Sequence, residues 1–89
     1  MDSYLITYDL CKPGQNYEKL YEAIKKHGKW CHCLESIWIV KSQNSAAAIR
    51  DALLSYIDNN DKILVVKLNG EGAWKGITDE CSKWLKENL

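Results

Sequence analysis

The order of strand-like and helix-like segments constrains this 89-residue chain more than any other feature of its sequence. Residues 3–9 place apolar side chains at every second position, which is typical of a strand. Residues 31–41 suit a long strand, and "KILVVKL" at 62–68 carries the clearest strand pattern in the chain. A further short strand is expected at 73–77. These segments are sufficient for one small sheet.

Three helices are predicted among and after these strands. Asn16 is a plausible N-cap of the first helix, which Gly28 ends, and Ser45 can cap the second. Thr78 can cap a last helix at the end of the chain. We interpret the segments as one ferredoxin-like α+β domain over residues 1–89. Its plan is βαββαβ, an antiparallel sheet with two helices on one face, followed by a C-terminal helix.

The two faces of the sheet can be sorted, because side chains alternate along a strand. One set is nearly all apolar and is assigned to the helices: Tyr4, Ile6, Tyr8, Leu34, Ser36, Trp38, Val40, Leu64, Val66 and Leu68. The other set contains an apolar band that no helix is expected to cover: Leu5, Ile37, Ile39, Ile63 and Val65. Such a band usually marks an interaction surface. We therefore expect a homodimer with two-fold symmetry, packed through this face or an adjacent sheet edge.

The charge balance argues against a strong general affinity for nucleic acid. Twelve Lys and Arg residues oppose twelve Asp and Glu residues, so the formal net charge is zero. Sequence-independent affinity for nucleic acid comes mainly from basic groups that release counterions from phosphates. Arg50 is the only arginine, although arginine is the better bidentate ligand of phosphate.

The first ten residues, "MDSYLITYDL", lack the basic region of a signal peptide, and no apolar run approaches the ~18 residues of a membrane span. We expect a cytoplasmic protein with no membrane partner. The four cysteines are then expected to be free thiols, because the cytosol keeps thiols reduced. They are Cys11, Cys31, Cys33 and Cys81.

The segment "WCHC" raises the question of a zinc site. Cys31 and Cys33 share one face of a strand and His32 takes the other, so these three cannot bind one ion in a regular strand. Structural zinc usually draws on a Cys-x₂-Cys spacing with a distant second pair. We interpret both cysteines as small apolar side chains at the start of a strand.

Asp9 stands where the first apolar run meets a loop, and two interpretations stay open. Aspartate is common in turns, because its side chain accepts hydrogen bonds from nearby backbone N–H groups. The alternative is a catalytic group or Mg²⁺ ligand displayed at the end of a rigid strand, as phosphodiester cleavage commonly requires. One carboxylate is too few to retain Mg²⁺, so this second role needs Asp9 from both subunits of a dimer.

Three further residues are candidates for contact with nucleic acid. Trp30 lies near a strand start and is suited to stack on a base, since aromatic side chains with nearby cations bind single strands. Lys12 and Lys41 are the candidate phosphate contacts, although the lysines of this chain are scattered rather than clustered.

The motifs "YLITYDL", "CLESIWIVK" and "KILVVKL" are similar to those of the CRISPR-associated Cas-two family. The same plan occurs in VapD-type toxin ribonucleases. A closer resemblance, which extends to the tail "WLKENL", is to small bacterial proteins of the SinR family. These similarities span essentially the whole chain. In contrast to the Cas-two family, which usually continues into a fifth strand that pairs with the partner subunit, residues 78–89 are predicted to be helical.

The resemblance implies a role for Asp9. In the Cas-two family the aspartate that ends the first strand lies near the dimer axis, and in some members it is implicated in metal-dependent cleavage. Ser36 matches a polar position on the family's second strand. The resemblance therefore implies a homodimeric, Mg²⁺-dependent endonuclease, with RNA preferred to DNA, in which Asp9 is the catalytic metal ligand. The alternative is a non-catalytic dimeric scaffold or a module that binds nucleic acid or protein.

Overall fold

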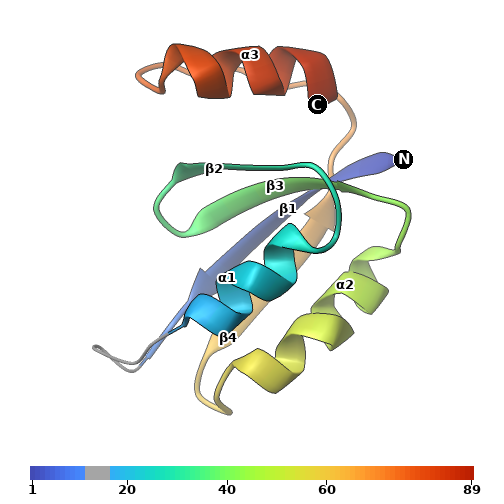
Figure 1. The fold of residues 1–89 in the computed structure, drawn as a ribbon, viewed down its shortest axis with the longest axis vertical. Coiled ribbons are helices and arrows are strands. Elements are labelled where there is room, and N and C mark those ends of the chain that lie inside the picture. Colours follow the sequence, from blue (N-terminus) through green and yellow to red (C-terminus); the bar gives the residue numbers. More distant parts are fainter. Residues whose placement is uncertain (12–16) are drawn as a thin grey trace.

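The computed structural model describes residues 1–11 and 17–89. Over these residues the chain forms a four-stranded antiparallel sheet in the order β2-β3-β1-β4. The strands are β1 (Asp2–Asp9), β2 (Trp30–Leu34), β3 (Ile37–Ser42) and β4 (Lys62–Lys67). The helices are α1 (Glu18–Lys25), α2 (Ala46–Leu53) with the short 3₁₀ turn η1 (Leu54–Tyr56), and α3 (Asp79–Asn88). Figure 1 shows α1 and α2 together on the sheet and α3 apart from them, near β2. The ferredoxin-like α+β prediction is confirmed.

The strand boundaries differ from the prediction at two places. The expected long strand 31–41 is a hairpin, in which Glu35 and Ser36 form the turn between β2 and β3. The expected strand at 73–77 is not a strand but part of the loop that leads to α3. The hairpin was missed because Ser36 is the only typical turn residue in its turn, and a single Ser within a strand-like run is a weak signal. The second strand of this hairpin completes the βαββαβ order.

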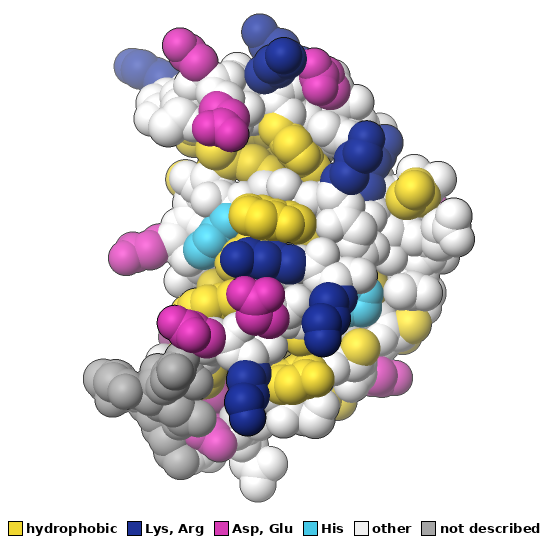
Figure 2. All heavy atoms as spheres, in the orientation of Figure 1, with side chains coloured by type: hydrophobic (Ala, Val, Ile, Leu, Met, Phe, Trp, Pro, Cys, Tyr) yellow, Lys and Arg dark blue, Asp and Glu magenta, His cyan; other side chains and the backbone are white. Residues whose placement is uncertain are grey.

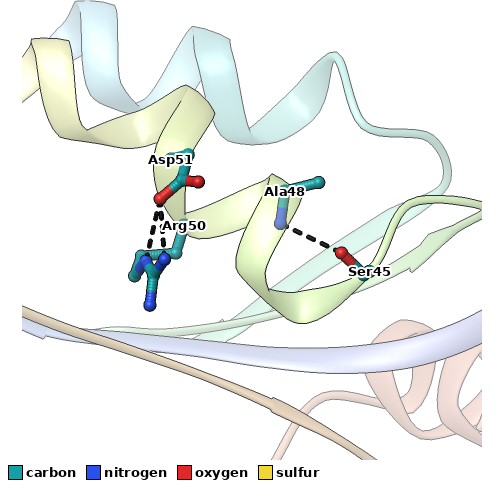
Figure 3. Close-up of polar contacts among 4 residues, drawn as sticks. All are labelled: Ser45, Ala48, Arg50 and Asp51. Atoms are coloured by element: carbon teal, nitrogen blue, oxygen red, sulfur yellow. Dashed lines mark hydrogen bonds and ion pairs between the residues drawn. The ribbon is translucent and has the colours of Figure 1, made fainter.

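A side-chain hydrogen bond caps the start of two of the three helices in the described part of the chain. The Ser45 hydroxyl accepts a hydrogen bond of 3.1 Å from the Ala48 N–H at the start of α2 (Figure 3). The Thr78 hydroxyl accepts one of 3.2 Å from the Cys81 N–H at the start of α3. Both predicted caps are confirmed. The predicted cap Asn16 lies outside the described residues.

The main core lies between the sheet and the helices α1 and α2. Trp38, Ile6, Leu20, Ile49 and Leu53 are almost completely buried there. The Trp38 indole N–H donates a hydrogen bond of 3.0 Å to the Tyr8 hydroxyl, which satisfies both polar groups inside the core. Burial raises the pKa of Tyr8. Each fully buried large apolar side chain stabilises the fold by roughly 1.5–3 kcal/mol.

The predicted faces are correct for β1 and β3, and wrong for β4 and for Leu34 of β2, which pairs with Ile37 on the other face. Ile63 and Val65 pack against the main core, whereas Leu64 is 55% exposed and Val66 is 38% exposed. The register explains the difference, because Val65 lies opposite Ile6 on the face that α1 and α2 cover. The run "ILVV" contains no polar residue that sets its phase, and a shift of one residue reverses every side chain.

The opposite face of the sheet is also partly covered, contrary to the expectation that no helix lies there. The Ser3 hydroxyl donates a hydrogen bond of 2.7 Å to the Asn88 carbonyl oxygen, which attaches the end of α3 to β1. Leu85 of α3 is buried. Between α3, its preceding loop and the sheet lies a cavity of about 250 Å³ whose lining includes Leu5, Ile37 and Ile39. Figure 2 shows hydrophobic side chains beneath α3.

None of the helices formed by the described residues is both long enough and apolar enough to cross a membrane.

Candidate functional site

Asp9 lies at the end of β1, at the edge of the molecule. Its side chain is exposed, and its register partner on β4 is Lys62. These residues line a shallow hollow together with Thr7, Tyr8 and Leu64. The strand backbone therefore holds one accessible carboxylate per chain at this position.

The turn contacts expected of a strand-end aspartate are made by Asp61 instead. One oxygen of Asp61 accepts a hydrogen bond of 2.8 Å from the Cys11 N–H, and the other accepts one of 2.8 Å from the Asp58 N–H. The Asp9 carboxylate makes no hydrogen bond or ion pair with any residue in the described ranges 1–11 and 17–89. The Asp9 carboxylate is not needed to hold this loop, because Asp61 already does so.

Asp9 borders the sheet face that lies opposite α1 and α2, which we call the open face. The register sets Ile39, Leu5 and Val66 in one cross-strand row. The next row consists of Ile37, Thr7 and Leu64. Leu5, Ile37 and Ile39 thus lie on the face where they were predicted, but Leu64 and Val66 occupy the places assigned to Ile63 and Val65. Leu64 and Val66 form the exposed apolar part of the open face on β4, beside Asp9, and Leu34 of β2 is a further exposed apolar side chain of this face.

The candidate contacts for nucleic acid do not converge on Asp9. Trp30 is 40% exposed but packs on Trp38 on the helix-covered side, with 5.4 Å between ring centroids, and the Lys25 ammonium lies 5.0 Å from its ring. Lys41 lies on the opposite face, across from Ser3. Ser3 precedes Asp9 by six residues of β1, or about 20 Å. Lys12 is outside the described residues.

The surface charges are mixed in sign. Arg50 forms an ion pair of 2.9 Å with Asp51 (Figure 3), and Lys67 pairs with Asp2 at 3.3 Å. Figure 2 shows basic and acidic side chains interspersed over the face in view. Among the described residues of that face, no basic groove is present to follow a phosphate backbone.

A second chemical feature brings together Cys31, Cys33 and Cys81. Their sulfur atoms all lie within 4.8 Å of one another, and within the described part of the chain they are the only such group of three or more His, Cys, Asp or Glu ligands. The Cys33 sulfur is in bonding contact with the sulfurs of both other residues. The prediction of free thiols therefore holds for the exposed Cys11 and is wrong for these three.

The sequence predicted the relative positions of Cys31 and Cys33 but not the approach of Cys81. Cys31 and Cys33 do share one face of β2, and His32 points the other way, with its ring stacked on Trp38 at 3.8 Å between centroids. Cys81 lies in the last helix that the sequence predicts. Its approach to β2 was not predicted, because it depends on where α3 docks.

A search of the sequence against models of known protein families finds no match. The similarity to the Cas-two and VapD-type proteins thus remains a prediction drawn from short motifs. The ferredoxin-like fold is compatible with it.

Proposed function

We propose that this chain acts as a homodimeric, Mg²⁺-dependent endonuclease that prefers RNA, with Asp9 of each subunit as the metal ligand. The observation that supports the proposal is the accessible carboxylate at the end of β1, next to the exposed apolar part of the open face. Asp61 performs the alternative, loop-holding role. The preference for RNA rests on the resemblance to VapD-type ribonucleases.

The residues near Asp9 fit a metal ion only if two copies of the chain combine. Within the described residues of one chain, Asp9 is not part of any group of three side chains that could hold a metal ion. Packing of Leu64 and Val66 against the same residues of a second copy would bury these apolar side chains and bring two Asp9 carboxylates together. Two such carboxylates repel each other unless a cation or proton lies between them. When bound, Mg²⁺ supplies positive charge to the phosphate and activates water.

The test of the dimer uses substitutions on the open face. Leu64→Glu with Val66→Glu should convert a dimer into a folded monomer, because four carboxylates would meet at the symmetric interface. The matched control is Leu54→Glu with Tyr56→Glu, since these side chains are 48% and 40% exposed on η1, away from the open face. Sedimentation velocity at micromolar concentration measures the change. A wild-type monomer would contradict the proposal.

The test of catalysis compares the wild type with Asp9→Asn and Asp51→Asn. Each protein is incubated with labelled RNA and with duplex DNA, with Mg²⁺ or Mn²⁺ and with a chelator. Asp9→Asn should lower the cleavage rate by roughly 10²-fold or more, as expected for loss of a group that acts on the reacting phosphate. Asp51→Asn should cleave normally. Cleavage that survives in Asp9→Asn or in chelator would contradict the role of Asp9.

The mixed surface charge favours a second candidate, a non-catalytic dimeric scaffold that binds protein or nucleic acid. Arg50 is engaged by Asp51, and Trp30 is already stacked on Trp38. Under this alternative, the wild type dimerises through the open face but cleaves neither substrate with either metal ion. The two assays above therefore separate the candidates.

A further inference from the structure

The three clustered cysteines come from two elements that are far apart in the sequence. Cys31 and Cys33 are alternate residues of β2, and the pairing of β2 with β3 is irregular between Cys31 and Leu34. Such an irregularity changes the direction of a side chain. Cys81 lies in the first turn of α3, 48 residues after Cys33. The Cα atoms of Cys33 and Cys81 are 6.0 Å apart, and those of Cys31 and Cys33 are 5.9 Å apart.

Disulfide bonds cannot account for both sulfur contacts of Cys33. The Cys33 sulfur contacts both of its neighbours, yet a sulfur atom forms only one disulfide. Any disulfide within the cluster would leave the third thiol without a covalent partner. A metal ion, by contrast, accepts electron pairs from three thiolates at once. We propose that Cys31, Cys33 and Cys81 form a binding site for one thiophilic metal ion, Zn²⁺ or Cu⁺, that joins α3 to β2.

The three sulfurs converge on one point, although Cys33 is in bonding contact with both neighbours and the sulfurs would have to separate to admit an ion. Zinc–sulfur bonds are about 2.3 Å long, so three sulfurs around one ion are separated by about 4 Å at most. All three sulfurs lie within 4.8 Å of one another, so in the reduced protein small side-chain movements would bring them to this spacing. Thiolates are the ligands that select Cu⁺ and Zn²⁺ over harder ions such as Mg²⁺. This site is therefore chemically distinct from the carboxylate of Asp9, and the inference is independent of the proposed function.

With three protein ligands, the site would bind Cu⁺ and Zn²⁺ with different coordination. No fourth His, Asp or Glu ligand accompanies the three cysteines in the described part of the chain. Cu⁺ is satisfied by three thiolates, whereas Zn²⁺ takes a fourth ligand from solvent, as in zinc sites with an open position. Binding of either ion displaces the thiol protons, so the affinity should rise with pH.

The way α3 is held gives the site a structural role. Leu85 and Asn88 are the only buried residues of α3, and the Asn88 carbonyl oxygen is bonded to Ser3 near the end of the helix. The opposite end of α3 reaches the sheet at Cys81. Because so little apolar surface holds this helix, an ion at the cysteine cluster would stabilise its docking directly.

The binding test uses the whole protein, reduced under anaerobic conditions and stripped of metal with a chelator. Zn²⁺ and Cu⁺ are titrated separately, and bound metal per chain is measured by equilibrium dialysis and elemental analysis. The wild type should bind one ion per chain. Cys11→Ser, which removes the exposed cysteine outside the cluster, should bind equally well. Cys81→Ser and Cys33→Ser should each lose at least tenfold in affinity.

A spectroscopic readout keeps the test independent of folding defects. Co²⁺ replaces Zn²⁺ in thiolate sites and produces sulfur-to-metal charge-transfer absorption, which should weaken in Cys81→Ser while far-UV circular dichroism stays that of the wild type. If reduced wild-type protein binds neither ion, the inference is wrong. It is also wrong if Cys81→Ser binds as tightly as the wild type. In protein purified in air without reductant, a mass lower by two hydrogens together with no bound metal would identify a disulfide instead.

Discussion

The two sides of the sheet are held in different ways. On the α1 and α2 side, large apolar side chains such as Trp38, Leu20 and Leu53 are buried in one continuous core. On the α3 side, Leu85 is the only buried apolar residue of the helix, and a cavity of about 250 Å³ lies beside it. Attachment there depends on single points, namely the Ser3–Asn88 hydrogen bond and the cysteine cluster. The buried apolar side chains of the main core thus stabilise the fold, whereas a few individual contacts position α3.

The largest expected contrast is between two leucine substitutions. Leu53→Ala removes a fully buried side chain from the main core and should lower the free energy of unfolding by about 3 kcal/mol. Leu85→Ala should cost only about 1 kcal/mol, because the site adjoins an existing cavity and α3 can detach separately. Urea denaturation measures both values. Equal losses would mean that α3 belongs to the same cooperative core.

A glycine pair tests the connection between α1 and β2. Gly28 has φ +141°, and a Cβ atom there would overlap the Lys41 carbonyl oxygen of β3. Gly28→Ala should therefore destabilise the protein by about 2–3 kcal/mol. Gly76, in the loop before α3, also has a positive φ, +86°, but a Cβ atom there would meet no other atom within 4 Å. Gly76→Ala should cost about 1 kcal/mol, as measured by thermal unfolding. Equal losses for the two substitutions would contradict the close contact at Gly28.

Two helix caps sharpen the comparison further. Ser45→Ala and Thr78→Ala each remove one hydrogen bond at a helix start, which costs about 1 kcal/mol. In α2 the loss should appear in global stability, because that helix is part of the main core. In α3 it should appear as faster amide hydrogen exchange confined to 79–88. Exchange that accelerates over the whole sheet in Thr78→Ala would contradict this division.

The smallest expected effect concerns His27, at the end of α1. Burial lowers its pKa below the ordinary value of 6.5, so the folded state binds a proton less readily than the unfolded state. The stability from this residue is complete above pH 6.5 and declines as the pH falls toward the lowered pKa. His27→Gln should flatten the pH dependence of the denaturation midpoint between pH 7 and about 5.

Several local features could be predicted because neighbouring residues encode them. The period of two in β1 placed Tyr4 and Ile6 in the core, and the hydroxyls of Ser45 and Thr78 identified two helix starts. The hairpin turn at Glu35 and Ser36 was missed because Ser36 is its only typical turn residue. For the candidate site, the place of Asp9 at a strand end was predictable, but the loop-holding role of Asp61 was not, since its contact with Cys11 spans 50 residues.

By itself, the sequence determined which segments with strong periodicity are strands or helices, because this depends on side chains a few positions apart. Only the tertiary structure decided the face of Leu64 and Val66, since a uniformly apolar run takes its phase from its neighbour β1. It also decided that Cys81 meets Cys31 and Cys33. That contact depends on how α3 docks, and docking results from packing across the whole sheet rather than from any local pattern.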